Sequence, residues 1–120
     1  LSRGVELDAG LLCTDDARNF VTSPVRHKCN RVLIEPLNDD KASALRTAAE
    51  IEEIVLEAGI TIEQVHHGYN LPCWSVNRRA LERGYGIRTG LEDVAILPDG
   101  RVAANNAELV RAAREMIIQA

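Results

Sequence analysis

The sequence predicts an α/β fold built from parallel βα units. Short apolar runs alternate with helical patterns four times within 120 residues. The connections run about two to six residues, as in compact α/β units, and strands that alternate with helices indicate a parallel sheet. Hydrophobic residues make up 46% of the chain and charged residues 27%, which is typical of one soluble globular domain. We therefore expect residues 1–120 to form a single domain.

The expected strands are short apolar runs that end at strand-breaking residues. Pro36 stops the second run and Gly68 breaks the third, because proline cannot donate to the ladder and glycine favours a turn. Asp99 and Gly100 turn the loop that follows the fourth. The expected strands are residues 4–7, 31–35, 61–67 and 86–92.

Capping residues and apolar stripes locate the helices. Residues 38–40 open the clearest helix and Gly59 ends it, as polar N-caps and a C-terminal glycine commonly do. Thr14 is expected to cap the first helix, and Asn105 the last, with Glu108 completing a capping box. Helices are also expected over residues 14–21 and 72–83. The predicted buried faces are Leu45, Ala48, Ile51, Val55 and Ala58 in the clearest helix, and Leu109, Ala113, Met116 and Ile117 in the last.

Two architectures accommodate four parallel βα units. One is a small doubly wound sheet. The other is four of the eight units of a (β/α)₈ barrel, a fold of about 250 residues in its complete form. The pattern of elements alone leaves both open.

The composition excludes several classes of function. Fourteen Lys and Arg against eighteen Asp and Glu give a net charge of −4, so no basic excess is present to bind a nucleic-acid backbone. No apolar run reaches the roughly 18 residues of a membrane span. Cys13, Cys29 and Cys73 are far apart in the sequence. We expect reduced thiols in a cytoplasmic protein, each one a small buried apolar group.

Charged and imidazole side chains follow the predicted strands, where parallel α/β folds place their active sites. Such a set suits a divalent metal with acid–base chemistry. Because neighbouring strand residues face opposite ways, only one of His66 and His67 can face the barrel interior. We favour His67, with a core or supporting histidine as the alternative. Solvated loop charges or a capping pair remain the alternative for Glu92 and Asp93. The strand-end residues are Glu6, Asp8, Glu35, His66, His67, Arg88, Glu92 and Asp93.

One segment of the sequence resembles the signature of a known enzyme family. Residues 88–93 read Arg-Thr-Gly-Leu-Glu-Asp, and residues 97–100 and 104–110 follow as Leu-Pro-Asp-Gly and Ala-Asn-Asn-Ala-Glu-Leu-Val. Together they resemble the C-terminal part of the β-keto acid cleavage enzymes, which include 3-keto-5-aminohexanoate cleavage enzyme. Residues 31–36, His67-Gly68 and Trp74 lie upstream in the order that family shows. The resemblance implies a (β/α)₈ TIM barrel, with this chain as strands five to eight, its C-terminal half.

The resemblance also implies a reaction and the residues that perform it. The family converts a β-keto acid and acetyl-CoA into acetoacetate and a new acyl-CoA, and it is therefore a carbon–carbon bond-cleaving acyltransferase. Its zinc is bound by a His-x-His pair from an early strand and by the glutamate that corresponds to Glu92. Asp93 is then the catalytic carboxylate and Arg88 its partner. We assign Asp8, Glu35 and His67 to substrate binding, and expect Asp8 rather than Glu6 at the end of the first strand.

The sequence departs from the family in more than one respect. Asp8 is our choice at the strand end where the family uses a glutamate. The sequence also contains no His-x-His, since His27 is isolated and His66 and His67 are adjacent. The chain also begins at Leu1 rather than Met, and we therefore expect a C-terminal fragment of a longer chain. A half barrel would expose two strand edges, so its partner is expected to be the remainder of the barrel or a second copy in a homo-oligomer. Two other functions remain open: a metal-dependent aldolase or isomerase barrel that needs no acetyl-CoA, and a non-catalytic fragment that acts through association.

Overall fold

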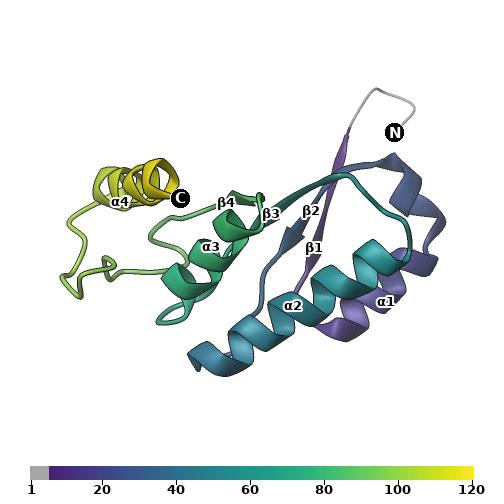
Figure 1. Cartoon of the computed structure of the whole chain (residues 1–120), viewed down its shortest axis with the longest axis horizontal. Helices are drawn as coiled ribbons and strands as arrows, with labels where there is room; N and C mark the ends of the chain where they lie inside the picture. Colours follow the sequence, from purple (N-terminus) through teal and green to yellow (C-terminus); the bar gives the residue numbers. More distant parts are fainter. Residues whose placement is uncertain (1–5) are drawn as a thin grey trace.

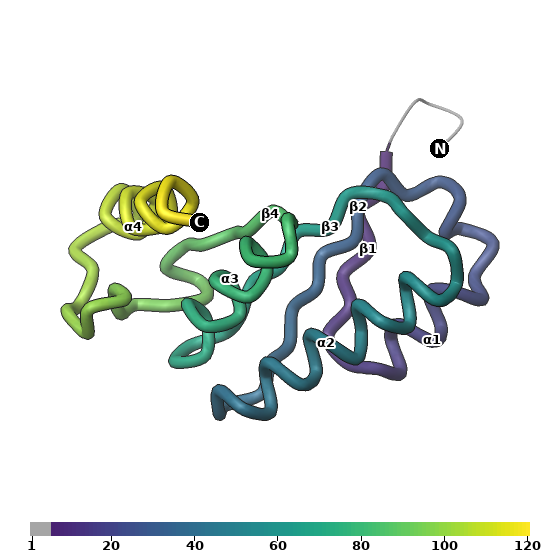
Figure 2. The backbone as a smooth tube through the Cα atoms, in the orientation of Figure 1, coloured from purple at the N-terminus to yellow at the C-terminus, as the bar shows by residue number. Residues whose placement is uncertain are grey.

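The computed structural model describes residues 6–120 and confirms an α/β fold in which four strands alternate with helices (Figure 1). The molecule is elongated, with extents of 43 × 33 × 24 Å, and β1 and α4 lie toward opposite ends of the long axis (Figure 2). The strands are β1 (Leu7–Leu11), β2 (Cys29–Ile34), β3 (Glu63–His66) and β4 (Gly86–Ile87). The helices are α1 (Thr14–Thr22), the short 3₁₀ helix η1 (Pro24–Lys28), α2 (Lys41–Glu57), α3 (Cys73–Glu82) and α4 (Asn106–Gln119).

The sheet has its strands in sequence order, β1-β2-β3-β4, and every neighbouring pair is parallel. A doubly wound sheet contains a point at which the strand order reverses, and the described strands have no such reversal. Consecutive strands of a (β/α)₈ barrel follow one another in this way. The strand order therefore agrees with the barrel alternative, whose closure stays a prediction.

None of the four predicted strands has the observed bounds, and the first and fourth differ most. The first strand begins at Leu7, where the predicted one ends, because residues 7–11 are the ones that pair with β2; Gly4 and Val5 lie outside the described residues. The fourth strand stops at Ile87, because the backbone N–H groups of Asp93 and Val94 both donate to the carbonyl of Gly90 and form a turn. This turn directs the chain after Arg88 away from the sheet and into a loop.

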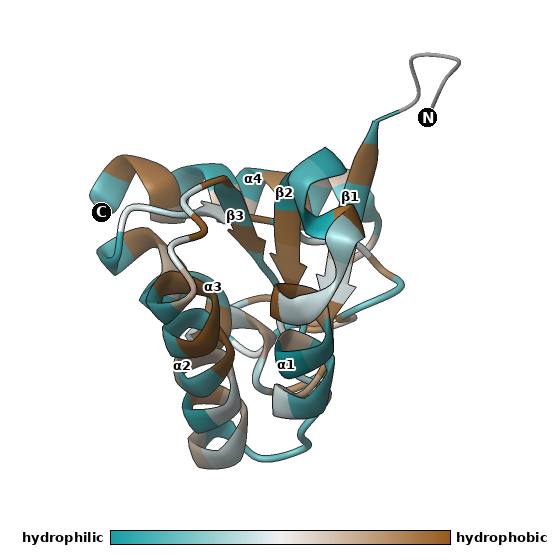
Figure 3. Ribbon diagram, turned by 90° about the vertical axis from the view of Figure 1, so that its right-hand side faces the viewer, coloured by the Kyte–Doolittle hydropathy of each residue, from teal (hydrophilic) through white to brown (hydrophobic). Residues whose placement is uncertain are grey.

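The apolar residues form two separate core clusters, one for each half of the chain. The first packs α1 and α2 against the same side of β1 and β2 (Figure 3). The second lies between α3, α4 and the loop that joins β4 to α4. Over residues 6–120, the structure contains no helix long and apolar enough to cross a membrane. The first cluster contains Leu11, Ala17, Phe20, Cys29, Val32, Ile34, Ala48, Ile51 and Val55, and the second Cys73, Trp74, Val94, Leu97, Ala103, Leu109, Ala113 and Met116.

Most of the predicted helix signals are confirmed. The side chains of Asp40 and Asn105 accept hydrogen bonds from the first turns of α2 and α4, and Glu108 completes a capping arrangement by accepting from the Ala104 backbone. Three details were wrong. Thr14 lies inside α1 rather than at its cap. Ile117 is 51% exposed, and Cys13 is exposed, because the burial of a residue near an element's end depends on packing across the fold.

A buried ion pair joins the two halves. Glu52 of α2 is buried, and its carboxylate lies 3.3 Å from Arg79 Nη2 and 2.6 Å from Arg83 Nε, both contributed by α3 or its C-terminal end. His66 of β3 is fully buried beside this group, and its ring stacks on Tyr85 at 5.1 Å between centroids. Burial lowers the pKa of His66 to about 4, so this ring is neutral near neutral pH.

Candidate active site

Three neighbouring strands each place a polar residue directly after their last ladder position. Glu35 follows β2, His67 follows β3 and Arg88 follows β4. Each continues the parallel ladder by one bond: their backbone N–H groups donate to the carbonyls of Leu11, Ile34 and His66 over 2.9, 3.0 and 3.2 Å. Residues at one level of a parallel sheet point to the same face. The three side chains therefore leave the sheet on the face opposite the helix-packed Ile34 and His66.

The His67 side chain lies between two carboxylates. Its Nε2 is 3.0 Å from Glu35 Oε1, and its Nδ1 is 3.1 Å from Asp93 Oδ2. The imidazole is 6% exposed and the Asp93 side chain 12%. Although these distances are short, His67 Nε2 and Asp93 Oδ2 have no aligned hydrogen bond among residues 6–120.

Asp93 reaches this cluster from a turn, not from a strand. Its backbone N–H donates to the carbonyl of Gly90 over 3.0 Å, and its own carbonyl accepts from the N–H of Asn70 over 2.6 Å. Burial raises the pKa of the Asp93 carboxyl above its ordinary value; His67 opposes this shift and Glu92 adds to it. A carboxyl group of raised pKa in a cluster of charged groups is a candidate for proton transfer.

Arg88 and Glu92 form a looser pair beside the cluster. Arg88 Nη2 lies 3.7 Å from Glu92 Oε1, and their side chains are 46% and 58% exposed. The Glu92 carboxylate folds back over Gly90, where a Cβ atom would overlap it. Because the Glu92 side chain is more than half exposed, its carboxylate can still accept a further partner.

Two asparagines that the sequence analysis missed position this loop. Asn77 is fully buried in α3, and its Nδ2 donates to the Arg88 carbonyl over 3.2 Å. Asn106 Oδ1 accepts from the Leu91 N–H over 2.8 Å and so ties the loop to the start of α4. A polar residue in the middle of the amphipathic 72–83 helix could have indicated Asn77. The second asparagine of the Asn105-Asn106 pair had no such signal.

The expectation that Asp8 follows a strand was wrong. Asp8 is the second residue of β1, where its carboxylate lies 3.2 Å from Arg31 Nε. Arg31 precedes Glu35 by four strand residues, which is about 13 Å along a strand. Asp8 thus lies far from the carboxyl edge, because the pairing with β2 begins three residues later than the sequence suggested. The structure brings Glu35, His67 and Asp93 together and leaves Asp8 outside.

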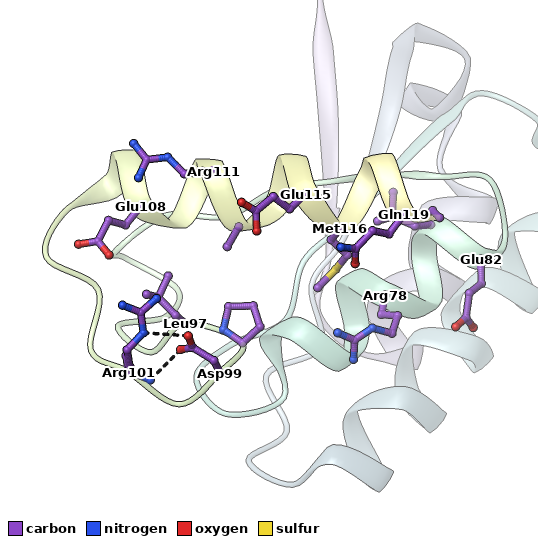
Figure 4. A pocket seen from close by; sticks show the side chains of 14 residues that line it. Arg78, Glu82, Leu97, Asp99, Arg101, Glu108, Arg111, Glu115, Met116 and Gln119 are labelled. Atoms are coloured by element: carbon purple, nitrogen blue, oxygen red, sulfur yellow. Dashed lines mark hydrogen bonds and ion pairs between the residues drawn. The ribbon is translucent and has the colours of Figure 1, made fainter.

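A separate pocket lies between α3, α4 and the 97–101 loop (Figure 4). It has a volume of about 600 Å³. Its rim carries charges of both signs, and Asp99 and Arg101 pair with each other across 2.8 Å. Among residues 6–120, no imidazole or cysteine lines it. The strand-end cluster is the better candidate site, because parallel α/β folds perform their chemistry at that edge.

A metal ion requires more donors than residues 6–120 gather in one place. No three His, Cys, Asp or Glu side chains of this part of the chain are arranged to hold one. The exposed Glu92 carboxylate fits one coordination position of a metal whose other ligands come from outside these residues. Glu35, His67 and Asp93 are already engaged with one another.

A carboxylate–imidazole cluster at the carboxyl edge of a parallel sheet is the arrangement of an α/β enzyme. The comparison with protein families gives the class a name: residues 42–120 match the beta-keto acid cleavage enzyme family. The match covers more than half of the chain, and the chain therefore belongs to this family. The matched range includes His67, Arg88, Glu92 and Asp93 but neither Asp8 nor Glu35. The comparison with curated proteins finds no match.

Proposed function

We propose that this chain supplies half of a (β/α)₈ barrel that converts a β-keto acid and acetyl-CoA into acetoacetate and an acyl-CoA. In this exchange the acyl group of the keto acid moves to the sulfur of CoA, and the acetyl group takes its place on the carbon that carries the carboxylate. The observation that carries the proposal is the 88–93 loop of a family member, which brings Asp93 against His67 at the carboxyl edge of the sheet.

Asp93 is the group we assign to the proton transfer. The carbon between the ketone and the carboxylate of a β-keto acid must lose a proton before it can attack the thioester. A carboxylate removes such a proton more readily when its pKa is raised toward the working pH, and burial raises the pKa of Asp93. Arg88, which is half exposed beside the loop, supplies the positive charge that steadies the anionic groups of the substrate.

Glu92 is the residue we assign to a zinc ion, with the remaining ligands contributed by the other half of the barrel. When bound, zinc would polarise the ketone oxygen. Two features support Glu92 in this role: its side chain is more than half exposed, and its contact with Arg88 is long at 3.7 Å. Asp93 is buried, and its Oδ2 faces His67. Neighbouring acidic residues in the same loop thus have different surroundings and can take different roles.

The first experiment tests the reaction. The complete protein is incubated with zinc, acetyl-CoA and a panel of β-keto acids, and acyl-CoA formation is followed by mass spectrometry. Exchange with one or more keto acids is the expected result. Turnover that does not need acetyl-CoA would instead indicate an aldolase or isomerase. Absence of any turnover across the panel would support a non-catalytic role.

The second experiment separates metal binding from proton transfer. Asp93→Asn should lower activity by roughly 100-fold or more, the usual scale for general acid–base catalysis, and leave the zinc content unchanged. Glu92→Gln should lower the zinc content, because it removes an anionic ligand. Asp99→Asn is the matched control, since Asp99 is exposed and pairs with Arg101 on the outer surface. Loss of zinc in Asp93→Asn with full zinc in Glu92→Gln would reverse the two roles.

A further inference from the structure

His67 is expected from its place at a strand end to bind substrate, but its ring is buried and lies between two carboxylates of this chain. An imidazole has two nitrogen atoms through which it can bind a partner. Both face carboxylates of this chain, Glu35 at 3.0 Å and Asp93 at 3.1 Å. The ring is also 6% exposed, so a substrate could touch little more than one edge of it.

The backbone around His67 is held on both sides. Its N–H extends the sheet ladder to the carbonyl of Ile34. The next residue, Gly68, lies so close to the start of α3 that a Cβ atom would come within 2.7 Å of Cys73 Cα. The imidazole is therefore mounted on a rigid strand end, whereas Asp93 sits on a turn that follows a strand of two residues.

We propose that His67 is a positioning residue that bridges Glu35 and Asp93 and orients the Asp93 carboxylate toward the substrate. Glu35 is the outer end of this bridge: it holds the ring by Nε2, so that Nδ1 stays directed at Asp93. Carboxylates commonly fix the orientation of a histidine in this way. The proposal rests on Asp93 as the catalytic carboxylate, and it replaces substrate binding as the role of both His67 and Glu35.

Two amide variants distinguish the two ends of the ring. The side-chain nitrogen of asparagine can take the place of Nδ1, and that of glutamine the place of Nε2. His67→Asn therefore keeps a donor toward Asp93, whereas His67→Gln keeps one toward Glu35 only. In the complete protein, His67→Gln should lower kcat by roughly 10- to 100-fold, the usual effect of losing a supporting hydrogen bond. KM for the keto acid should not change, and His67→Asn should retain most of the wild-type kcat.

A double variant tests whether His67 acts through Asp93. Adding His67→Gln to Asp93→Asn should cost no further activity, because the group that it positions is already lost. A raised KM with unchanged kcat in the His67 variants would overturn the proposal in favour of substrate binding. Equal losses in His67→Asn and His67→Gln, together with lower melting temperatures, would overturn it in favour of a structural role. His27→Gln, at an exposed position, is the matched control.

Glu35→Gln provides a second test if the His67 variants do not fold. It should lower kcat without changing KM, while Glu63→Gln, at the exposed opposite end of β3, should have no effect. The bridge itself can be observed apart from activity by NMR of ¹⁵N-labelled histidine. The Nδ1 signal should move in Asp93→Asn and the Nε2 signal in Glu35→Gln; no movement in either would overturn the bridge. If Asp93→Asn is fully active, the proposed function fails; if only the His67 variants behave otherwise, this inference alone fails.

Discussion

The two halves of the chain follow the same order of strand and helix but are built in different ways. In the N-terminal half, β1 through α2, the strands pair at five register positions from Leu7 to Leu11, and one continuous core lies beneath them. In the C-terminal half, β3 through α4, β3 and β4 pair at only two positions. The second core cluster of that half lies between α3, α4 and the loop that joins β4 to α4.

The difference teaches where this fold places stability and where it places chemistry. The N-terminal half has the longer ladder and contributes Glu35 to the strand-end cluster. In the C-terminal half, β4 ends at Ile87. The residues that follow form the loop that carries Arg88, Glu92 and Asp93. Side chains such as Asn77 and Asn106 hold that loop in place of strand pairing. Function is commonly carried by loops on a regular scaffold, and here the two lie in different halves.

The largest effect on stability is expected in the N-terminal core. Ile51 is fully buried between α2 and the sheet, so Ile51→Ala should lower the free energy of unfolding by about 2–5 kcal/mol. Ile117→Ala in α4 is the matched change in the C-terminal half. Because Ile117 is half exposed, it should cost less than about 1 kcal/mol. Urea unfolding of both variants measures the difference, and equal losses would contradict the proposed division.

The next effect is a pH dependence at the junction of the halves. Burial lowers the pKa of His66 from 6.5 to about 4. The folded-state pKa of His66 lies below its unfolded-state pKa. Its contribution to the free energy of unfolding is therefore fully present above about pH 6.5 and is lost as the pH falls toward 4. The total loss is about 3 kcal/mol. Unfolding measured across this range should show it in the wild type and not in His66→Phe; identical pH profiles would exclude His66 as the cause.

A smaller effect is expected where His67 meets α3. Gly68→Ala would place a Cβ atom 2.7 Å from Cys73 Cα, a backbone atom that cannot easily move. We expect a loss of about 1–3 kcal/mol, as for overpacking generally, together with lower activity because His67 shifts. Gly10→Ala is the control in the N-terminal half, where the nearest atom is Glu35 Oε1 at 3.6 Å. Its stability should stay within about 0.5 kcal/mol of the wild type, and a similar loss in both variants would argue against the close approach.

The smallest effect on stability is expected at the two asparagines that begin α4, and it tests directly whether side chains hold the 88–93 loop. Asn106→Ala removes the acceptor for the Leu91 N–H and should cost about 0.5–1.5 kcal/mol. Asn105→Ala removes the cap of α4, at about 1 kcal/mol, but leaves the bond to the loop intact. The two variants should therefore be similar in stability and differ in kcat, which falls only for Asn106→Ala. Equal kcat values would mean that the loop does not depend on this bond.

The sequence predicted the places of site residues correctly where side chains alternate regularly along a strand, and less well where the place depends on which residues pair with the next strand. Alternation along the third strand correctly separated His66, which packs among the helices, from His67 at the sheet edge. The Arg88 to Asp93 segment was recognised by its residues alone. Asp8 was misplaced, because the sequence marks an apolar run without marking which of its residues pair with the next strand. The assignments of Arg88, Glu92 and Asp93 to their roles stay predictions that the variants above can test.

The sequence by itself determined the parallel βα order, the helix caps at Asp40 and Asn105, and the family. These features depend on local spacing and on residue types that act within one turn or one strand. Only the tertiary structure decided that β4 ends after two residues and that Glu35, His67 and Asp93 meet. These three residues are 32 and 26 positions apart in the sequence. Their contact exists because parallel pairing sets the ends of β2 and β3 at one level and the turn after β4 brings Asp93 back to His67, and no local pattern specifies that arrangement.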